Sequence, residues 1–267
     1  MISAKRISVR LGRSPILHDV DFAASPGRVT AIAGPNGSGK TTLLRALTGD
    51  VPFTGRVEIN RRDLASLDAF ELASMRAVLP QSANLSFPFT VREIVRLGLV
   101  GGRSGAAGGA LETIIEEALI RVDLAGFAGR YYQELSGGEQ QRVQLARVLC
   151  QVWRPVLDGV PRFLFLDEPV SSLDIRHQLV IMNIAREFAE AGGGVVAILH
   201  DLNLTAMYAD QVAVVHRGRL AAAGEPRTVL TDDLLETVFE CRLQVSVAPP
   251  SGGMFVLPQS AANSRTT

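Results

Sequence analysis

Four short runs of apolar, largely β-branched residues stand out along the chain. They cover residues 29–33, 163–166, 195–199 and 212–215. A strand with one face in water alternates apolar and polar positions, whereas a strand that is buried on both faces is apolar throughout. The four runs therefore predict strands inside a sheet that is covered on both sides.

A helical pattern separates the second and third of these runs. Its apolar positions recur at spacings of three and four, which places them along one face of an α-helix. A strand, a helix and a strand in this order imply a parallel sheet with crossover helices. The predicted fold class is therefore α/β. The apolar positions of the helix are Ile175, Leu179, Met182, Ala185 and Phe188.

The span of residues 82–134 follows a different pattern. Thr90 and Glu93 form a capping box in front of one apolar helical stripe, and a second stripe covers residues 111–122. A glycine-rich stretch at residues 101–109 separates the two and is typical of a flexible loop. We interpret the span as a helical insertion in the α/β core.

A candidate phosphate-binding loop follows the first predicted strand and precedes a leucine-rich helix. Glycines let backbone N–H groups curl around phosphate oxygens, at a helix N-terminus whose dipole favours an anion. Lys40 is expected to reach the β- and γ-phosphates, and the Thr41 hydroxyl to bind Mg²⁺. The alternative is a glycine-rich turn that precedes Lys-Thr by chance, but the flanking strand and helix favour nucleotide binding. The loop comprises Gly34, Pro35, Asn36, Gly37, Ser38, Gly39, Lys40 and Thr41.

Two carboxylates end the next clear strand. The run 163–166 leads directly into Asp167 and Glu168, at the carboxyl edge of the sheet, where α/β proteins bind ligands. Asp167 is expected to hold Mg²⁺ through water, and Glu168 to orient or deprotonate the attacking water. The alternative is a solvated acidic strand end without a catalytic role.

The amino-acid composition indicates which classes of partner and which cellular compartment to expect. The 267 residues include 27 Lys and Arg against 27 Asp and Glu, so the formal net charge is zero, and apolar residues make up 47%. This argues for a globular protein without the basic surface that binding nucleic acid requires. Cys150 and Cys241 lack metal-ligand spacing, and a reducing compartment is the simpler interpretation. Because the sequence shows neither a signal-peptide pattern nor a bilayer-length apolar stretch, we expect a cytosolic protein. If it works at a membrane, something else must hold it there.

A third motif, LSGGEQQR, occupies residues 135–142. Ser136 and Glu139 form a capping box at the start of a helix. Placed after the phosphate loop and before the Asp-Glu strand, the motif closely resembles the signature of ABC transporter ATPases. The resemblance implies that Ser136, Gly137, Gly138 and Glu139 present bare N–H groups to the γ-phosphate of ATP bound by the opposite subunit of a dimer.

Three further positions match motifs of this family in order. Gln81 resembles the Q-loop glutamine, which touches Mg²⁺ and the attacking water. Residues 172–174, Ser-Leu-Asp, resemble the D-loop, which crosses the dimer interface, and we call them the D-loop segment. His200 resembles the switch histidine, which contacts the γ-phosphate and supports Glu168. The resemblance covers roughly residues 1–245.

The resemblance implies a complete set of site residues. Catalytic roles fall to Glu168, His200 and Gln81, and metal binding to Thr41, Gln81 and Asp167. Nucleotide binding falls to the phosphate loop together with Thr42, Ser136 to Glu139, and Asp174.

One position departs from the family pattern. ABC ATPases usually stack an aromatic side chain on adenine from a loop near the N-terminus, and this loop contains none. Leu11 and Arg13 are left as candidates for the adenine contact. We interpret His18, His177 and His216 as surface or packing residues.

The sequence around His200 resembles one group within the family. The stretch HDLNLTAMYAD, residues 200–210, is similar to ATPases that serve importers of ferric siderophores, haem and cobalamin, and residues 87–91, 153–155 and 174–178 are similar to haemin-import ATPases. The resemblance implies an ATPase that uses ATP and Mg²⁺ to drive haemin import, with a ferric siderophore or cobalamin as the alternative cargo.

The same resemblance implies the partners and the location. They are a homodimer of ATPase subunits, two integral-membrane permease subunits and, indirectly, a periplasmic substrate-binding protein, at the cytoplasmic face of the bacterial inner membrane. An exporter ATPase would share the same hydrolytic residues and is a close alternative. A soluble ABC ATPase of DNA repair or translation needs paired cassettes or long coiled-coil insertions, and a P-loop kinase has no use for LSGGEQ.

The resemblance implies the architecture of a P-loop NTPase of the ABC ATPase type. It combines a RecA-like parallel sheet core with an antiparallel β subdomain and an inserted α-helical subdomain. Within a single ABC ATPase domain at residues 1–245, we expect the core at 1–81 and 143–230 and the helical subdomain at about 82–142. Residues 231–267 are expected to form a C-terminal helix and tail.

Overall fold

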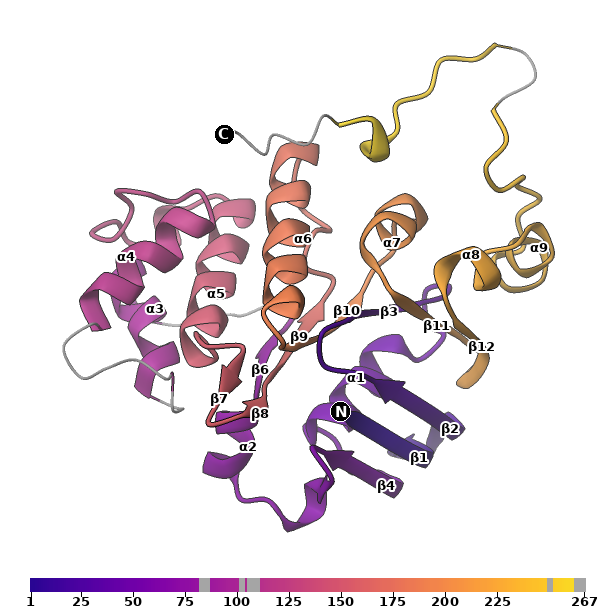
Figure 1. Cartoon of the computed structure of the whole chain (residues 1–267), viewed down its shortest axis with the longest axis horizontal. Coiled ribbons are helices and arrows are strands. Elements are labelled where there is room, and N and C mark those ends of the chain that lie inside the picture. The colour runs from indigo at the N-terminus through magenta and orange to yellow at the C-terminus, as the bar shows by residue number, and fades with distance from the viewer. Residues whose placement is uncertain (82–86, 101–103, 105–110, 249–251, 262–267) are drawn as a thin grey trace.

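A six-stranded sheet forms the centre of the computed structural model, which describes residues 1–81, 87–100, 104, 111–248 and 252–261 (Figure 1). Its strand order is β12-β11-β3-β10-β9-β6, and only the edge strand β12 is antiparallel to its neighbour. The glycine-rich loop expected at 101–109 lies, except for Ser104, outside the described residues. The bounds are β3 Val29–Ala33, β6 Arg76–Leu79, β9 Phe163–Asp167, β10 Gly194–Ile198, β11 Gln211–His216 and β12 Arg219–Gly224.

The four predicted strands correspond to β3, β9, β10 and β11, and both faces of this sheet are buried as expected. Along β9, Phe163 and Phe165 enter one hydrophobic core, and Leu164 and Leu166 enter the other. Because successive side chains of a strand point to opposite faces, a continuously apolar strand fills both cores. The carboxyl edge of the sheet is therefore a firmly packed base for the loops that follow each strand.

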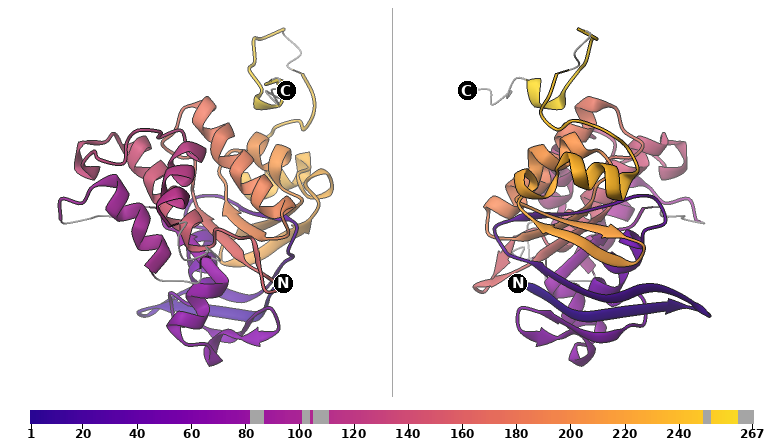
Figure 2. Two further views of the ribbon diagram at one scale, coloured as in Figure 1. Left: turned by 60° about the vertical axis from the view of Figure 1, so that its left-hand side comes forward. Right: turned by 90° about the vertical axis from the view of Figure 1, so that its right-hand side faces the viewer.

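A second, antiparallel sheet covers one face of the molecule, in the order β2-β1-β4-β5. It shares a core with the central sheet and with the leucines of α1 (Lys40–Thr48) that follow the phosphate loop. Figure 2 shows this sheet at the opposite end of the molecule from the C-terminal arm. The bounds are β1 Ile2–Leu11, β2 Ser14–Ala24, β4 Thr54–Ile59 and β5 Arg62–Asp63.

Three helices form the helical part of the molecule: α3 (Val91–Val100), α4 (Leu111–Arg121) and α5 (Gly137–Gln151). The expected capping box before α3 is present, with Glu93 N donating to Thr90 Oγ1 at 3.3 Å and Thr90 N donating to Glu93 Oε2 at 2.7 Å. Helix α5 contacts α3 and α4 on one side and β6 on the other. The boundary predicted at residue 142 lies inside α5, because buried side chains continue its apolar face beyond that residue.

The remaining helices cover the central sheet and its edges. Helix α6 (Ile175–Glu190) is the predicted crossover helix. Helix α9 (Asp232–Phe239) follows its N-cap Thr231, whose Oγ1 accepts a hydrogen bond from Leu234 N at 3.2 Å. The α/β fold expected from the sequence is confirmed. The other elements are α2 Ala69–Met75, α7 Leu202–Tyr208, α8 Pro226–Val229, β7 Val156–Leu157, β8 Val160–Pro161 and the short 3₁₀ turns Leu64–Ser66, Tyr132–Glu134 and Pro258–Ser260.

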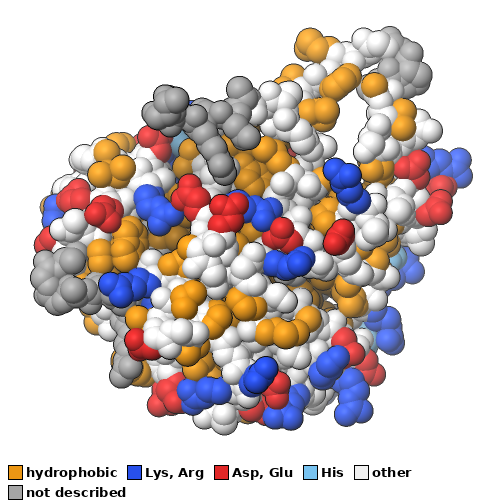
Figure 3. All heavy atoms as spheres, viewed as in Figure 1, with side chains coloured by type: hydrophobic (Ala, Val, Ile, Leu, Met, Phe, Trp, Pro, Cys, Tyr) orange, Lys and Arg blue, Asp and Glu red, His pale blue; other side chains and the backbone are white. Residues whose placement is uncertain are grey.

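An extended arm follows α9 and returns toward α7. Its hydrophobic side chains are open to solvent (Figure 3): Met254 is 96% exposed and Val256 is 75% exposed. Gln259 Nε2 donates to Asn203 O at 3.2 Å, which attaches the arm to α7. Across the described ranges, no helix combines the length and the hydropathy that a membrane span requires.

Candidate functional site

The phosphate loop connects β3 to α1 and lies very close to its neighbours. Gly34 has a φ of 143°, and a Cβ at this position would lie 2.1 Å from Val215 O. Gly39 has a φ of 107°, and its Cβ would lie 2.8 Å from Leu17 Cδ2. Only glycine fits such contacts at a positive φ. These two glycines therefore let the loop lie directly on β11 and β2.

Lys40 lies inside this loop and is only 5% exposed. Its Nζ donates to Gly34 O at 3.0 Å and to Pro35 O at 2.9 Å. Burial lowers the pKa of Lys40, and the nearby carboxylates of Glu168 and Asp167 partly offset that shift. The ammonium is thus held by two backbone carbonyls of the loop, at the N-terminus of α1, a position that suits the binding of a polyphosphate.

Asp167, the last residue of β9, lies beside the first turn of α1. Thr41 Oγ1 donates to Asp167 Oδ1 at 3.4 Å. Burial raises the pKa of Asp167, and the charge of Glu168 raises it further, while Thr41, Lys40 and His200 oppose the shift. A hydroxyl and a carboxylate this close together are the hard oxygen donors that Mg²⁺ prefers.

Glu168 is contacted by the two other side chains that the sequence analysis assigned to catalysis. Gln81, just beyond β6, donates from Nε2 to Glu168 Oε2 at 2.9 Å. His200, just beyond β10, places Nε2 at 2.6 Å from Glu168 Oε1. Three segments that are distant in sequence therefore meet at one carboxylate, which could accept a proton from a water molecule.

A cavity of about 840 Å³ opens above the phosphate loop. Among the described residues, neither Leu11 nor Arg13 lines it, and Leu11, at the end of β1, is 45% exposed. Ile16 of β2 supplies the aliphatic wall instead. The sequence analysis missed Ile16 because it searched the turn for an aromatic side chain, whereas this apolar residue lies further along the strand. The lining residues are Ile16, Asn36, Gly37, Gly39, Lys40, Thr41, Thr42, Gln81, Glu168, Ser171 and His200.

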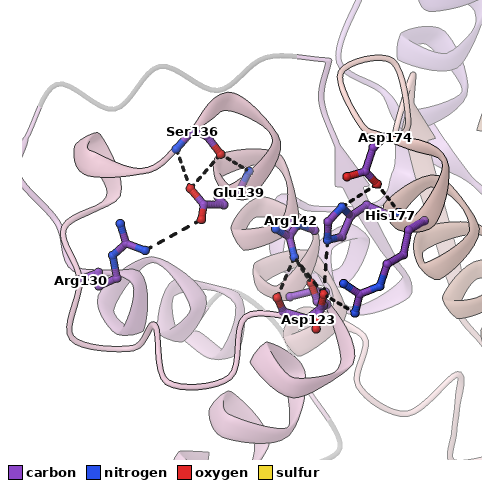
Figure 4. A network of polar contacts seen from close by, with 9 residues as sticks. Asp123, Arg130, Ser136, Glu139, Arg142, Asp174 and His177 are labelled. Carbon is purple, nitrogen blue, oxygen red and sulfur yellow. Dashed lines mark hydrogen bonds and ion pairs between the residues drawn. The ribbon is translucent and has the colours of Figure 1, made fainter.

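The signature residues form the N-terminus of α5 (Figure 4). Ser136 Oγ accepts a hydrogen bond from Glu139 N at 3.4 Å, and Ser136 N donates to Glu139 Oε2 at 2.8 Å. Ser136 Oγ also donates to Glu139 Oε2 at 2.8 Å, and the two hydrogen bonds that Ser136 donates to this carboxylate lower the pKa of Glu139. A Cβ added at Gly137 would meet no atom within 4 Å. The predicted capping box is therefore present, and the backbone in front of Gly137 is open.

A polar network links the same helix to the start of α6 (Figure 4). Arg142 Nη1 donates to Val122 O at 3.0 Å and to Asp123 O at 2.7 Å. His177 Nε2 lies 3.3 Å from Asp123 Oδ2, and its Nδ1 lies 2.8 Å from Asp174 Oδ1. Asp174 also accepts from His177 N as the N-cap of α6. His177 is thus a packing residue that joins the helical part to the D-loop segment.

The structure gathers the predicted site residues into two groups. The phosphate loop, Gln81, Asp167, Glu168 and His200 surround or adjoin the cavity, whereas Ser136 to Glu139 and Asp174 are absent from the described residues that line it. One chain therefore carries the candidate phosphate site and the signature residues as two separate groups.

Comparison with known proteins places this arrangement in context. The sequence profile of the ABC transporter family matches residues 17–171. The "Hemin import ATP-binding protein HmuV" of Mesorhizobium japonicum is 67% identical over 261 residues, which cover 98% of this chain and 99% of that protein. The protein with the same name from Rhizobium meliloti is 62% identical over 264 residues, with 98% and 99% covered.

Solved structures of similar shape agree with the sequence comparison. A dimeric bacterial ABC transporter cassette is 28% identical with a TM-score of 0.73, and the match covers 85% of this chain and 99% of the cassette. A post-hydrolysis state of an ATP-binding cassette, bound to ADP and Pi, is 27% identical with a TM-score of 0.73, over the same shares of the two chains.

Proposed function

The chain belongs to the ABC transporter family. We propose that it is the ATP-hydrolysing subunit of a bacterial importer, and that this importer carries haemin through a separate membrane permease. The observation that supports haemin as the cargo is the 67% identity, over 98% of the chain, to a relative named for hemin import. The grouping of Glu168, Gln81 and His200 beside the phosphate loop supports ATP hydrolysis.

The phosphates of ATP bind the loop, where they replace the carbonyl partners of Lys40. Glu168 accepts a proton from a water molecule as the water oxygen forms its bond to the γ-phosphorus and the bond to the leaving ADP oxygen breaks. Gln81 and His200 orient the carboxylate. Thr41, Asp167 and Gln81 would hold Mg²⁺, which when bound neutralises charge on the β- and γ-phosphates.

A second copy of the chain completes each site. Ser136 to Glu139 of that copy would face the γ-phosphate, and its Asp174 would cross the interface between the copies. The helical part would contact the permease near Gln81, so that closing of the dimer moves the membrane subunits. The protein would then sit at the cytoplasmic face of the inner membrane, and a periplasmic binding protein, which delivers cargo to the permease, would be an indirect partner.

The test is iron nutrition of a strain that lacks the gene. Growth on haemin as the sole iron source should be lost, should return with the wild-type gene, and should stay absent with Lys40→Ala. Growth on a ferric siderophore or an iron salt, and uptake of cobalamin, should be unchanged. Intact haemin use together with loss of siderophore or cobalamin uptake would overturn haemin as the cargo and leave the importer ATPase standing.

A further inference from the structure

Gln141 lies one turn into α5, and its side chain extends from the helical part toward Glu168. Its Nε2 donates to Glu168 O at 3.1 Å. Its Oε1 accepts a hydrogen bond from Ser172 Oγ at 2.6 Å. Both ends of one amide are therefore used, and they join the signature helix to the backbone of Glu168 and to the D-loop segment.

The contact falls on an unusual stretch of backbone. Glu168 has a φ of 52°, in the left-handed region that residues with a Cβ avoid. Its carbonyl also accepts from Ser171 Oγ at 3.2 Å, a donor of the same turn. Such conformations persist only where the surroundings hold them in place. Gln141 is a donor to this carbonyl from a different part of the fold.

The neighbouring Gln140 shows that this contact is not a general property of the helix. Gln140 Nε2 donates to Tyr132 O at 3.1 Å and to Leu135 O at 3.2 Å, both within the helical part. Two adjacent glutamines of one helix thus serve different ends. Gln140 holds the backbone of residues within the helical part, whereas Gln141 contacts the backbone of Glu168.

We propose that Gln141 is a positioning residue that couples the orientation of the signature helix to the geometry of Glu168 in the same chain. This rests on the proposed function, in which the signature turn contacts ATP bound by the second copy. Movement of α5 toward that ATP then changes the hydrogen bond at the Glu168 carbonyl. The geometry of Glu168 in each chain would therefore depend on whether the partner chain has bound ATP.

The coupling predicts a particular kinetic signature. Gln141 contacts no residue of the phosphate loop through these hydrogen bonds, so its loss should leave ATP binding intact. The loss should instead lower the rate of the hydrolytic step, because the Glu168 carboxylate is set by the backbone that carries it. Loss of a side chain that only stabilises the fold would lower the midpoint temperature of thermal unfolding, called the thermal midpoint below, and would leave the kcat of the folded protein unchanged.

The experiment compares Gln141→Leu and Gln141→Glu with Gln140→Leu in the full chain. Leu removes both hydrogen bonds at similar size, whereas Glu can still accept from Ser172 Oγ but cannot donate to the Glu168 carbonyl. Both Gln141 variants should lower kcat at least tenfold, with the Kd for ATP and the thermal midpoint close to wild type. Gln140→Leu should lower the thermal midpoint and keep kcat within twofold.

Two outcomes would overturn the inference. One is kcat within twofold of wild type in both Gln141 variants, and the other is a loss of kcat that only follows a matching loss of ATP affinity or folding. Ser172→Ala serves as a second, milder variant and should add nothing to the kcat of Gln141→Leu. A wild-type chain without any ATPase activity would instead refute the proposed function, so the two failures are distinguishable.

Discussion

His200 Nε2 lies 2.6 Å from Glu168 Oε1, on the opposite side of the carboxyl group from Gln81. The side chain of the proposed base is therefore held at both oxygens. Each of these two contacts can be tested by changing His200 or Gln81 separately.

Replacing Glu168 with Gln should abolish turnover and preserve ATP binding, because the amide keeps the shape of the side chain but cannot accept the proton. ATP should then trap a closed dimer of this variant, visible as a doubled mass by light scattering. His200→Ala should lower kcat by about 10²-fold through loss of orientation. ATP turnover by Glu168→Gln at the wild-type rate would remove Glu168 from the role of base.

Ile16→Ala tests the aliphatic wall of the cavity. The substitution removes about three carbon atoms of apolar contact, and the KM for ATP should rise by about 5- to 20-fold with kcat little changed. Leu11→Ala is the matched control, since Leu11 does not line the cavity, and its KM should equal that of wild type. The reverse ranking of the two variants would favour Leu11, rather than Ile16, as the contact of the adenine ring.

Arg142 and Arg176 form a matched pair for stability, since both approach Asp123. Arg142 is 7% exposed and donates to two backbone carbonyls, whereas the Arg176 side chain is 72% exposed. Arg142→Ala leaves buried acceptors unpaired and should lower the free energy of unfolding by about 3 kcal/mol. Arg176→Ala should cost less than about 1 kcal/mol. Urea denaturation would measure both, and equal losses would contradict this account of Arg142.

The two cysteines should react at very different rates. Burial raises the pKa of Cys150 to about 12, and Cys241 is exposed. The thiolate is the reactive form, so the Cys150 thiol stays protonated and unreactive at pH 8, and its reactivity should rise only at much higher pH. A colorimetric thiol reagent should modify one group per native chain at pH 8, none in Cys241→Ser, and both in urea. Prompt modification of two thiols in the native protein would contradict the packing of α5.

Local signals predicted the parts of the fold that local forces determine. The continuously apolar strands and the capping boxes at Thr90 and Ser136 depend on residues a few positions apart, and both appear at the predicted positions. Helix α5 runs from Gly137 to Gln151 and contacts β6, so the predicted limit at residue 142 lies within one helix.

Contacts between distant segments set the rest of the site. Ile16 enters the cavity because of the way the antiparallel sheet lies over the phosphate loop, and Gln141 reaches Glu168 because α5 packs beside the D-loop segment. Neither contact corresponds to a fixed spacing along the chain, so a sequence pattern cannot predict it. The residues of the phosphate loop were recognisable because their chemistry requires a fixed order along the chain.

The separation of the signature turn from the cavity of its own chain determines how the proposed homodimer would respond to genetic change. A substitution at Ser136 would damage the site of the neighbouring copy, and Lys40→Ala would damage the site of its own copy. A mixed dimer of a Ser136 variant with a Lys40 variant would concentrate both defects in one composite site and leave the other intact. Two inactive alleles, expressed together, would therefore restore part of the activity that neither has alone.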